Sequence, residues 1–189
     1  MNFNCKITKV PSAVCDTSVS GIIKLALVNW SEEYSFTSSV EGSCEIDTID
    51  IGTGENEQHF LEIPIADNSG YANANATAGG NAGQKAIMHQ VGGVINRLDC
   101  NVQSDWKNYL LGRVIIAVMT KNGQVLLFGV NNGLTATNFD FATGTAETDA
   151  QGITFLYEGL QKDAPEIVKS WSIISDTFPK QSGGGNGKP

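Results

Sequence analysis

The chain has 189 residues, enough for one domain with a sizeable core. Only 17% of the residues are charged and 21 are Gly against 5 Pro, which favours many tight turns and an all-β fold. The net charge of -8 argues against a protein that binds nucleic acid through its phosphates. No window approaches the roughly 18 apolar residues that a membrane helix needs, and Met1–Lys6 lacks the pattern of an export signal.

The first third of the chain contains one clear strand. Met1–Val19 mixes polar residues with short apolar pairs, as in a loose terminus or an arm that pairs with a neighbouring subunit. Gly21–Trp30 is a short, nearly continuous apolar run, which predicts a strand buried on both faces.

Weaker signals follow up to residue 65. Ser31–Val40 is polar and is expected to be a loop, and Cys44–Ile51 alternates only weakly, as a marginal strand. Gln58–Ile65 alternates as a strand. Pro64 cannot donate to a ladder, so this strand lies at an edge or ends there.

The negative charge is local. No Lys or Arg lies between Lys24 and Lys85, whereas ten carboxylates do. They are Glu32, Glu33, Glu41, Glu45, Asp47, Asp50, Glu55, Glu57, Glu62 and Asp67. Such a run is most often a solvated face that aids solubility; the alternative is a surface kept negative so that a polyanion moves past it without sticking.

Ala66–Gln84, ADNSGYANANATAGGNAGQ, consists almost entirely of Ala, Asn, Gly, Ser and Thr. This composition predicts a loop that buries too little apolar surface to order itself. Lys85–Val94 reads as a strand that pairs with Gln58–Ile65, which makes the whole a hairpin with a long tip. The tip is either a flexible linker or a loop that orders against a neighbouring copy.

One helix is predicted, at Ser104–Leu111, with Ser104 as N-cap and Gly112 at its C-terminal end. Trp106, Tyr109 and Leu110 share one face of it, which is expected to cover one end of the sheet.

Gly112–Gly159 predicts a four-strand meander. Two apolar runs flank the turn pair Asn122-Gly123, and period-2 alternation at Phe139–Thr145 and at Ile153–Tyr157 adds two further strands. Glu166–Phe178 has enough apolar residues for one more strand, and Lys180–Pro189 has the composition of a disordered tail.

Nothing in the sequence has the spacing of a catalytic or cofactor motif, so we expect no enzyme activity and no cofactor. His59 and His89, flanked by Glu57, would approach each other if their strands paired, but no third metal ligand has motif spacing. Glu55 and Glu57 do not make a glycosidase couple by adjacency alone. The four cysteines, Cys5, Cys15, Cys44 and Cys100, lack zinc-site spacing and are expected to be reduced.

The motifs RVIIAVMTKNGQVLLFG and TGTAETDAQGITFLYEG, the trailing Ala164-Pro165, and the strand Gly21–Trp30 together resemble bacteriophage tail tube (major tail) proteins. The resemblance implies one β-sandwich or barrel domain over residues 1–180, with one short helix, a long loop at 66–84 and a tail at 181–189. It implies a structural virion protein of the phage tail, made in the host cytoplasm, whose hexameric rings stack into a tube. Its partners would be further copies of itself, the tape measure, the terminator and the baseplate or hub; DNA would pass through without specific binding, and no membrane would be involved.

The same resemblance assigns roles to two sets of residues. A loop between stacked rings would include Asp67, Asn68, Tyr71, Asn73 and Asn75. An acidic lumen would draw on Glu45, Asp47, Asp50, Glu55, Glu57 and Glu62.

Three alternatives stay open on the sequence alone. The first is a non-catalytic β-sandwich that binds carbohydrate or protein, although Trp30, Trp106 and Trp171 all lie in apolar runs typical of a core. The second is a tube or adaptor protein of a related injection system. The third is a β-barrel enzyme, which only the two histidines support.

Overall fold

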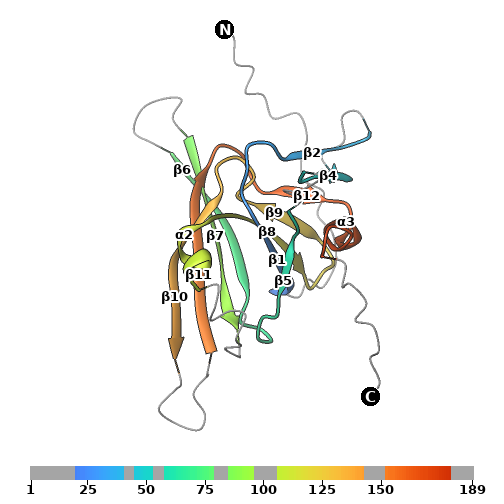
Figure 1. Ribbon diagram of the computed structural model, residues 1–189. Helices are drawn as coiled ribbons and strands as arrows, with labels where there is room; N and C mark the ends of the chain where they lie inside the picture. Colours follow the sequence, from blue (N-terminus) through green and yellow to red (C-terminus); the bar gives the residue numbers. More distant parts are fainter. Residues whose placement is uncertain are drawn as a thin grey trace, which may run out of the picture.

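The computed structural model describes residues 20–40, 45–52, 58–78, 85–95, 106–142 and 152–179. Within these ranges the chain forms twelve strands and two short helices, which confirms the all-β fold (Figure 1). The strands are β1 (Ile22–Asn29), β2 (Ser35–Thr37), β3 (Glu45–Ile46), β4 (Thr48–Asp50), β5 (Leu61–Ile63), β6 (Tyr71–Ala78), β7 (Lys85–Ile95), β8 (Arg113–Thr120), β9 (Val125–Phe128), β10 (Leu134–Ala142), β11 (Gly152–Gln161) and β12 (Glu166–Val168). The helices are α2 (Trp106–Leu111) and α3 (Trp171–Ser175).

Strands β1 and β8 form the centre of the molecule. They pair antiparallel from Ile22 opposite Thr120 to Asn29 opposite Val114, with one irregularity near Lys24. Four consecutive residues of β1, Leu25 to Val28, are buried, so both faces of the strand are covered. The apolar run of Gly21–Trp30 is therefore confirmed as a doubly buried strand.

The sheet divides at β8. One edge of β8 pairs with β1, and the other pairs with β9 at Ile116–Met119 and with β10 at Arg113–Val114. The predicted meander is wrong at this point, because β9 and β10 both pair with β8 instead of with each other. The chain turns from β9 to β10 through Gly129 and Gly133, which have φ values of 82° and 67°. A Cβ on Gly129 would lie 2.7 Å from the Leu134 side chain, so this corner requires glycine.

The strands therefore form two layers. The central sheet runs β5-β1-β8-β9-β12-β3, and its last pair, β12 with β3, is parallel. The four-stranded sheet runs β10-β11-β7-β6, is antiparallel, and joins the central sheet at the β8–β10 contact. Figure 1 shows the four-stranded sheet as one layer beside the central sheet.

Two cores cover the two faces of the central sheet. The first lies between the sheets and includes Leu25, Ile116, Phe155 and Tyr157. The second lies on the opposite face, where α3 and the two-stranded ribbon β2-β4 cover residues such as Val28. The alternation within β1 and β8 divides their side chains between these cores, which is why both strands are apolar at almost every position.

The hairpin predicted for Gln58–Ile65 and Lys85–Val94 is wrong. β5, the three-residue strand within the first segment, pairs with β1 and ends before Pro64. β7 pairs instead with β6, which lies inside the segment predicted to be an unordered loop. That segment orders because its backbone groups bond to β7, and a strand beside a sheet needs no large apolar surface of its own.

One of the two helices was predicted, and the other lies in a segment predicted to be a strand. α2 confirms the helix that ends at Gly112, while its predicted N-cap, Ser104, lies outside the described residues. Glu166–Phe178 was predicted as a single strand, but contains β12 and then α3. Ser170 caps α3 by accepting a hydrogen bond from the backbone N–H of Ser172, a capping signal that interrupts the apolar run. The predicted fold with one short helix thus has two among the described residues.

Candidate assembly surface

Both outer strands of the four-stranded sheet have an unpaired edge in the described part of the chain. β6 pairs only with β7. β10 pairs with β8 through Leu134 and Thr135, and beyond these residues pairs only with β11. The two free edges lie on opposite sides of the same sheet, and free edges expose backbone groups that can pair with another chain.

One face of the four-stranded sheet packs on the first core and the other faces away from it. Phe139, Phe155, Tyr157 and Val91 lie on the core side. Residues that alternate with the core side make up the outer face. It includes Tyr71, Asn73, Asn75, Met88, Gln90, Val94, Thr135, Asn138, Asp140, Thr154, Leu156, Glu158 and Leu160.

This outer face mixes polar and apolar side chains and has one sign of charge. Among the strand residues that compose it, Asp140 and Glu158 are charged, and both are acidic. Asn75 donates to the Gln90 side chain at 3.5 Å, and Gln90 in turn donates to the Glu158 carboxylate. A row of polar side chains thus crosses three neighbouring strands.

The five residues predicted for an inter-ring loop lie in a turn and on a strand. Asp67 and Asn68 belong to the turn before β6, where Asn68 has a positive φ of 59° and accepts a hydrogen bond from Lys121. Tyr71, Asn73 and Asn75 alternate on β6 and point to the outer face. The prediction of a loop is wrong for these three, and residues 79–84 lie outside the described residues.

Four of the six predicted lumen residues are described, and none lies on the four-stranded sheet. Glu45 and Asp50 are exposed on β3 and β4, and Glu62 is exposed on β5. Asp47 accepts hydrogen bonds from Ser39, which are the main cause of its lowered pKa. Glu55 and Glu57 lie outside the described residues, as do the four cysteines.

The two histidines do not meet on paired strands. His59 donates from Nδ1 to the carbonyl oxygen of Thr177 at 2.9 Å, beside α3. His89 on β7 is buried, and Nε2 donates to the carbonyl oxygen of Asp163 at 3.1 Å while Nδ1 accepts from the Gly129 N–H. Burial lowers the pKa of His89, which favours the neutral imidazole. In that state both ring nitrogens have a hydrogen-bond partner.

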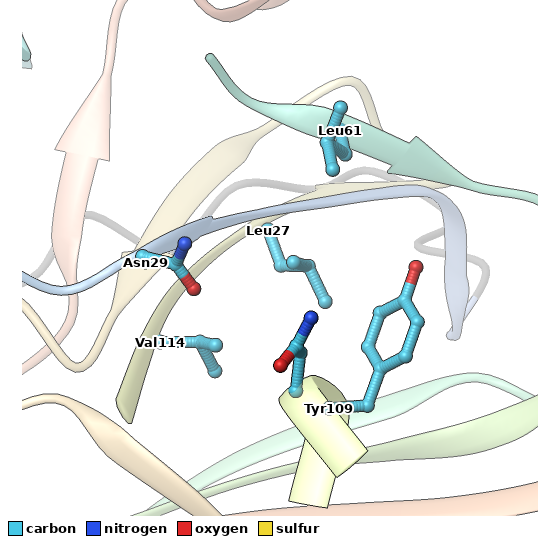
Figure 2. Close-up of a pocket in the computed structure, with 6 residues that line it drawn as sticks. Leu27, Asn29, Leu61, Tyr109 and Val114 are labelled. Atoms are coloured by element: carbon cyan, nitrogen blue, oxygen red, sulfur yellow. The ribbon is translucent and has the colours of Figure 1, made fainter. Parts of the chain in front are cut away.

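A small pocket lies between β1, β5, β8 and α2 (Figure 2). Its volume is about 130 Å³, and it is lined by Leu27, Asn29, Leu61, Asn108, Tyr109 and Val114. Pockets for drug-sized ligands span roughly 300 to 1,000 Å³. Its polar groups are the side-chain amides of Asn29 and Asn108 and the phenol of Tyr109. These groups provide no acid–base pair, so the pocket does not support a catalytic function.

Of the three tryptophans, two have described side chains; Trp171 lies in the second core as expected, and Trp30 packs against that core. Trp171 is only 8% exposed and belongs to the second core. Trp30 is half-buried, and its Nε1 donates to the carbonyl oxygen of Val130 at 3.1 Å. Neither presents the exposed aromatic platform typical of a carbohydrate-binding module.

No group of three or more His, Cys, Asp or Glu among the described residues could hold a metal ion. No helix in the same part of the chain is long and apolar enough to cross a membrane. Comparisons with protein-family models, with curated proteins and with solved structures give no match to this chain.

Two features of this surface are not evident from the sequence. The acidic residues of the outer face, Asp140 and Glu158, lie far in sequence from the acidic block and are isolated among uncharged residues. The second is the strand β6, whose sequence YANANATA alternates Ala with Asn or Thr after Tyr71. This period of two indicates a strand, but the segment has the polar composition of a loop, which obscures the pattern.

Proposed function

We propose that this chain is a structural protein whose copies assemble into closed rings that stack into a tube, as the subunits of phage tail tubes do. The observation that carries the proposal is the four-stranded sheet with a free edge on each side among the described residues. The sequence resemblance to tail tube proteins supports it independently.

The two free edges differ from each other, so a contact between them joins one copy head-to-tail to the next. A head-to-tail contact leaves a free edge at each end of the growing assembly. It ends only when the ring closes, or it continues as a helix. Strand addition at a sheet edge is a common way to form such contacts, because the backbone supplies the hydrogen bonds.

A ring built in this way turns one face of the four-stranded sheet toward its bore. Most of the core-side face packs on the first core, so the outer face with Asp140 and Glu158 lines the bore. Phosphate groups bind chiefly through Lys and Arg, and the strands contribute neither to this face. A DNA duplex therefore passes without being held. In this arrangement Glu45, Asp47 and Asp50 lie on the outer wall, in contrast to the lumen role expected from the sequence.

The state of assembly tests the proposal directly. Purified protein is examined by light scattering after size exclusion and by negative-stain electron microscopy, over a range of protein concentrations and ionic strengths. Rings or tubes are expected. A monodisperse monomer at all concentrations would contradict the proposal and would favour the alternative of a β-sandwich binding module.

Charge reversal then tests which face lines the bore. Asp140→Lys places a cation on the outer face, and Asp50→Lys is the matched control on β4, since both carboxylates are exposed. Assembled Asp140→Lys is expected to retain DNA at low salt and to release it as screening increases, whereas Asp50→Lys does not retain DNA. The reverse result would assign the lumen to the acidic block.

A further inference from the structure

A groove runs along the free part of β10, beside helix α2. It is lined by Leu110 of α2 and by Ala136–Phe141 of β10, and it is open to the outside. Leu110 is 37% exposed and Phe141 is 38% exposed. The helix is fixed over β10 on the core side, where the Tyr109 ring stacks on Phe139 at 5.5 Å and the Tyr157 hydroxyl donates to the Tyr109 carbonyl oxygen.

The groove has two sides of different chemistry. On the core side, Leu110 and Phe141 expose apolar surface next to the edge of β10 that pairs with no other described strand beyond Thr135. On the outer side, Asn138 and Asp140 alternate along β10 with Phe139 and Phe141 and are polar. A strand that fits this edge must therefore have small apolar side chains on one face, where the helix limits the space, and polar side chains on the other.

Strand β6 has this pattern. Its residues opposite the core-side positions of β7 are Ala72, Ala74 and Ala76, and the residues between them are Asn73 and Asn75. Ala74 and Ala76 are exposed, and β6 has no charged residue from Tyr71 to Ala78. Its outer edge is unpaired within the described chain.

We infer that β6 of one copy adds to the free edge of β10 of the next copy, with its alanine face seated under Leu110 and Phe141. This inference rests on the proposed ring assembly and specifies the contact that builds it. The two asparagines then lie on the same face as Asn138 and Asp140, so the polar face continues from one copy to the next. Alanine is required because a larger side chain would occupy the space that Leu110 fills.

The match between the small side chains of β6 and the large side chains of Leu110 and Phe141 also explains why β6 enters the groove with one particular face toward the core. The strand that enters the groove buries no charge, so no unpaired ion is desolvated. The exposed apolar surface of Leu110 and Phe141 is removed from water, and the free backbone groups of both strands are paired. Helix α2 thus sets which face of the incoming strand points to the core.

The test enlarges side chains on opposite faces of β6. Ala74→Leu and Ala76→Leu enlarge the alanine face, and Asn73→Gln, which stays polar, is the matched control on the other face. We expect each alanine variant to raise the protein concentration needed for half-maximal ring formation at least tenfold. The control is expected to raise this concentration less than threefold. Both alanines are exposed in the single chain, so thermal unfolding of the monomeric variants should stay close to that of the wild type.

A second change makes the test specific for the groove. Leu110→Ala opens the space under α2 and is combined with Ala74→Leu and, separately, with Ala76→Leu. At least one double variant should assemble at a concentration within threefold of the wild type, because the added volume on β6 replaces the volume lost from α2. Equal effects on both faces of β6, or no recovery in either double variant, would overturn the inference while the wild type still forms rings. A wild type that forms no rings would refute both the inference and the proposed function.

Discussion

The His89 imidazole and the backbone N–H of Gly129 are joined by a hydrogen bond of 3.3 Å. It ties β7 of the four-stranded sheet to the corner at which the chain leaves β9. His89 also makes an edge-to-face contact with Phe128, with ring centroids 5.3 Å apart. The corner that connects the two sheets is therefore fixed partly by a side chain that must remain neutral to accept this bond.

The first prediction follows from the lowered pKa of His89, which is caused mainly by burial. Because the folded-state pKa lies below that of the unfolded chain, about 6.5, the unfolded chain takes up the proton first. The free energy of unfolding should therefore fall as the pH drops below about 6.5. The difference between wild type and His89→Gln, measured by urea unfolding of the monomer from pH 5 to 8, should shrink toward acid. A pH-independent difference would contradict this.

Glu166 should have the opposite dependence on pH. Its pKa is raised, first by burial and then by the neighbouring Asp163 carboxylate, so the folded chain favours the neutral acid. Its contribution to stability is present at low pH and is lost as the pH rises through the folded-state pKa. Glu166→Gln is therefore expected to be more stable than the wild type at pH 7 and equal to it near pH 3.5. Paired denaturant curves at the two pH values measure this.

Gln161 stabilises the same corner from β11. Its side chain is buried, accepts from the Asn132 N–H at 3.0 Å and donates to the Gly133 carbonyl oxygen at 2.9 Å. Gln161→Leu removes both bonds, which should cost about 1 to 3 kcal/mol for each polar group left buried and unpaired. Gln124→Leu changes an exposed side chain and is expected to cost less than about 0.5 kcal/mol. Equal unfolding midpoints for the two variants would rule out this role.

Two glycines with similar close contacts should respond differently to alanine. A Cβ on Gly159 would lie 2.7 Å from the backbone oxygen of Gly133, and one on Gly92 would lie 2.7 Å from the end of the Tyr71 ring. The Tyr71 side chain is exposed and can rotate away, whereas the backbone at the corner cannot. Gly159→Ala should destabilise by about 1 to 3 kcal/mol, as overpacking does, and Gly92→Ala by less. Thermal unfolding ranks the two.

Helix α3 should contribute to the core despite its five residues. Ile174 is completely buried, so Ile174→Ala is expected to cost about 2 to 5 kcal/mol through lost burial and the cavity that remains. Leu111→Ala, at a position of α2 that is 83% exposed, is the control, and its free energy of unfolding is expected to change by less than about 0.5 kcal/mol. If Ile174→Ala unfolded like the wild type, the packing of α3 on the central sheet would be in doubt.

The strands that could be predicted from the sequence are those whose local pattern suffices to define them. β1 is apolar on both faces, and β8 and β9 flank an Asn-Gly turn, so their burial or turn chemistry identifies them. Which strands pair could not be predicted. β9 and β10 are neighbours in sequence, but the glycine corner directs β10 to the end of β8, and this depends on contacts with Val114 and Leu134 that local periodicity does not contain.

The assembly surface was harder to predict because its strand lacks a hydrophobic signature. β6 acquires order from the backbone of β7, with Tyr71 covering Gly92 and Ala72 packing on the first core. Composition alone therefore predicts a loop there. The same limit applies to the acidic residues: a run of carboxylates along the chain stands out in a sequence, whereas Asp140 and Glu158 are placed on one face only by strand register.

Trp30 and the Val130 carbonyl oxygen that its indole binds are 100 positions apart in the chain, although they mark the ends of strands in one sheet. During synthesis, β1 has only the three-residue strand β5 as a partner until β8 leaves the ribosome. At about 5 to 20 residues per second, that interval lasts on the order of ten seconds. One edge of this largely apolar strand thus lacks its partner during the whole of that time, which makes β1 a segment that a chaperone would bind.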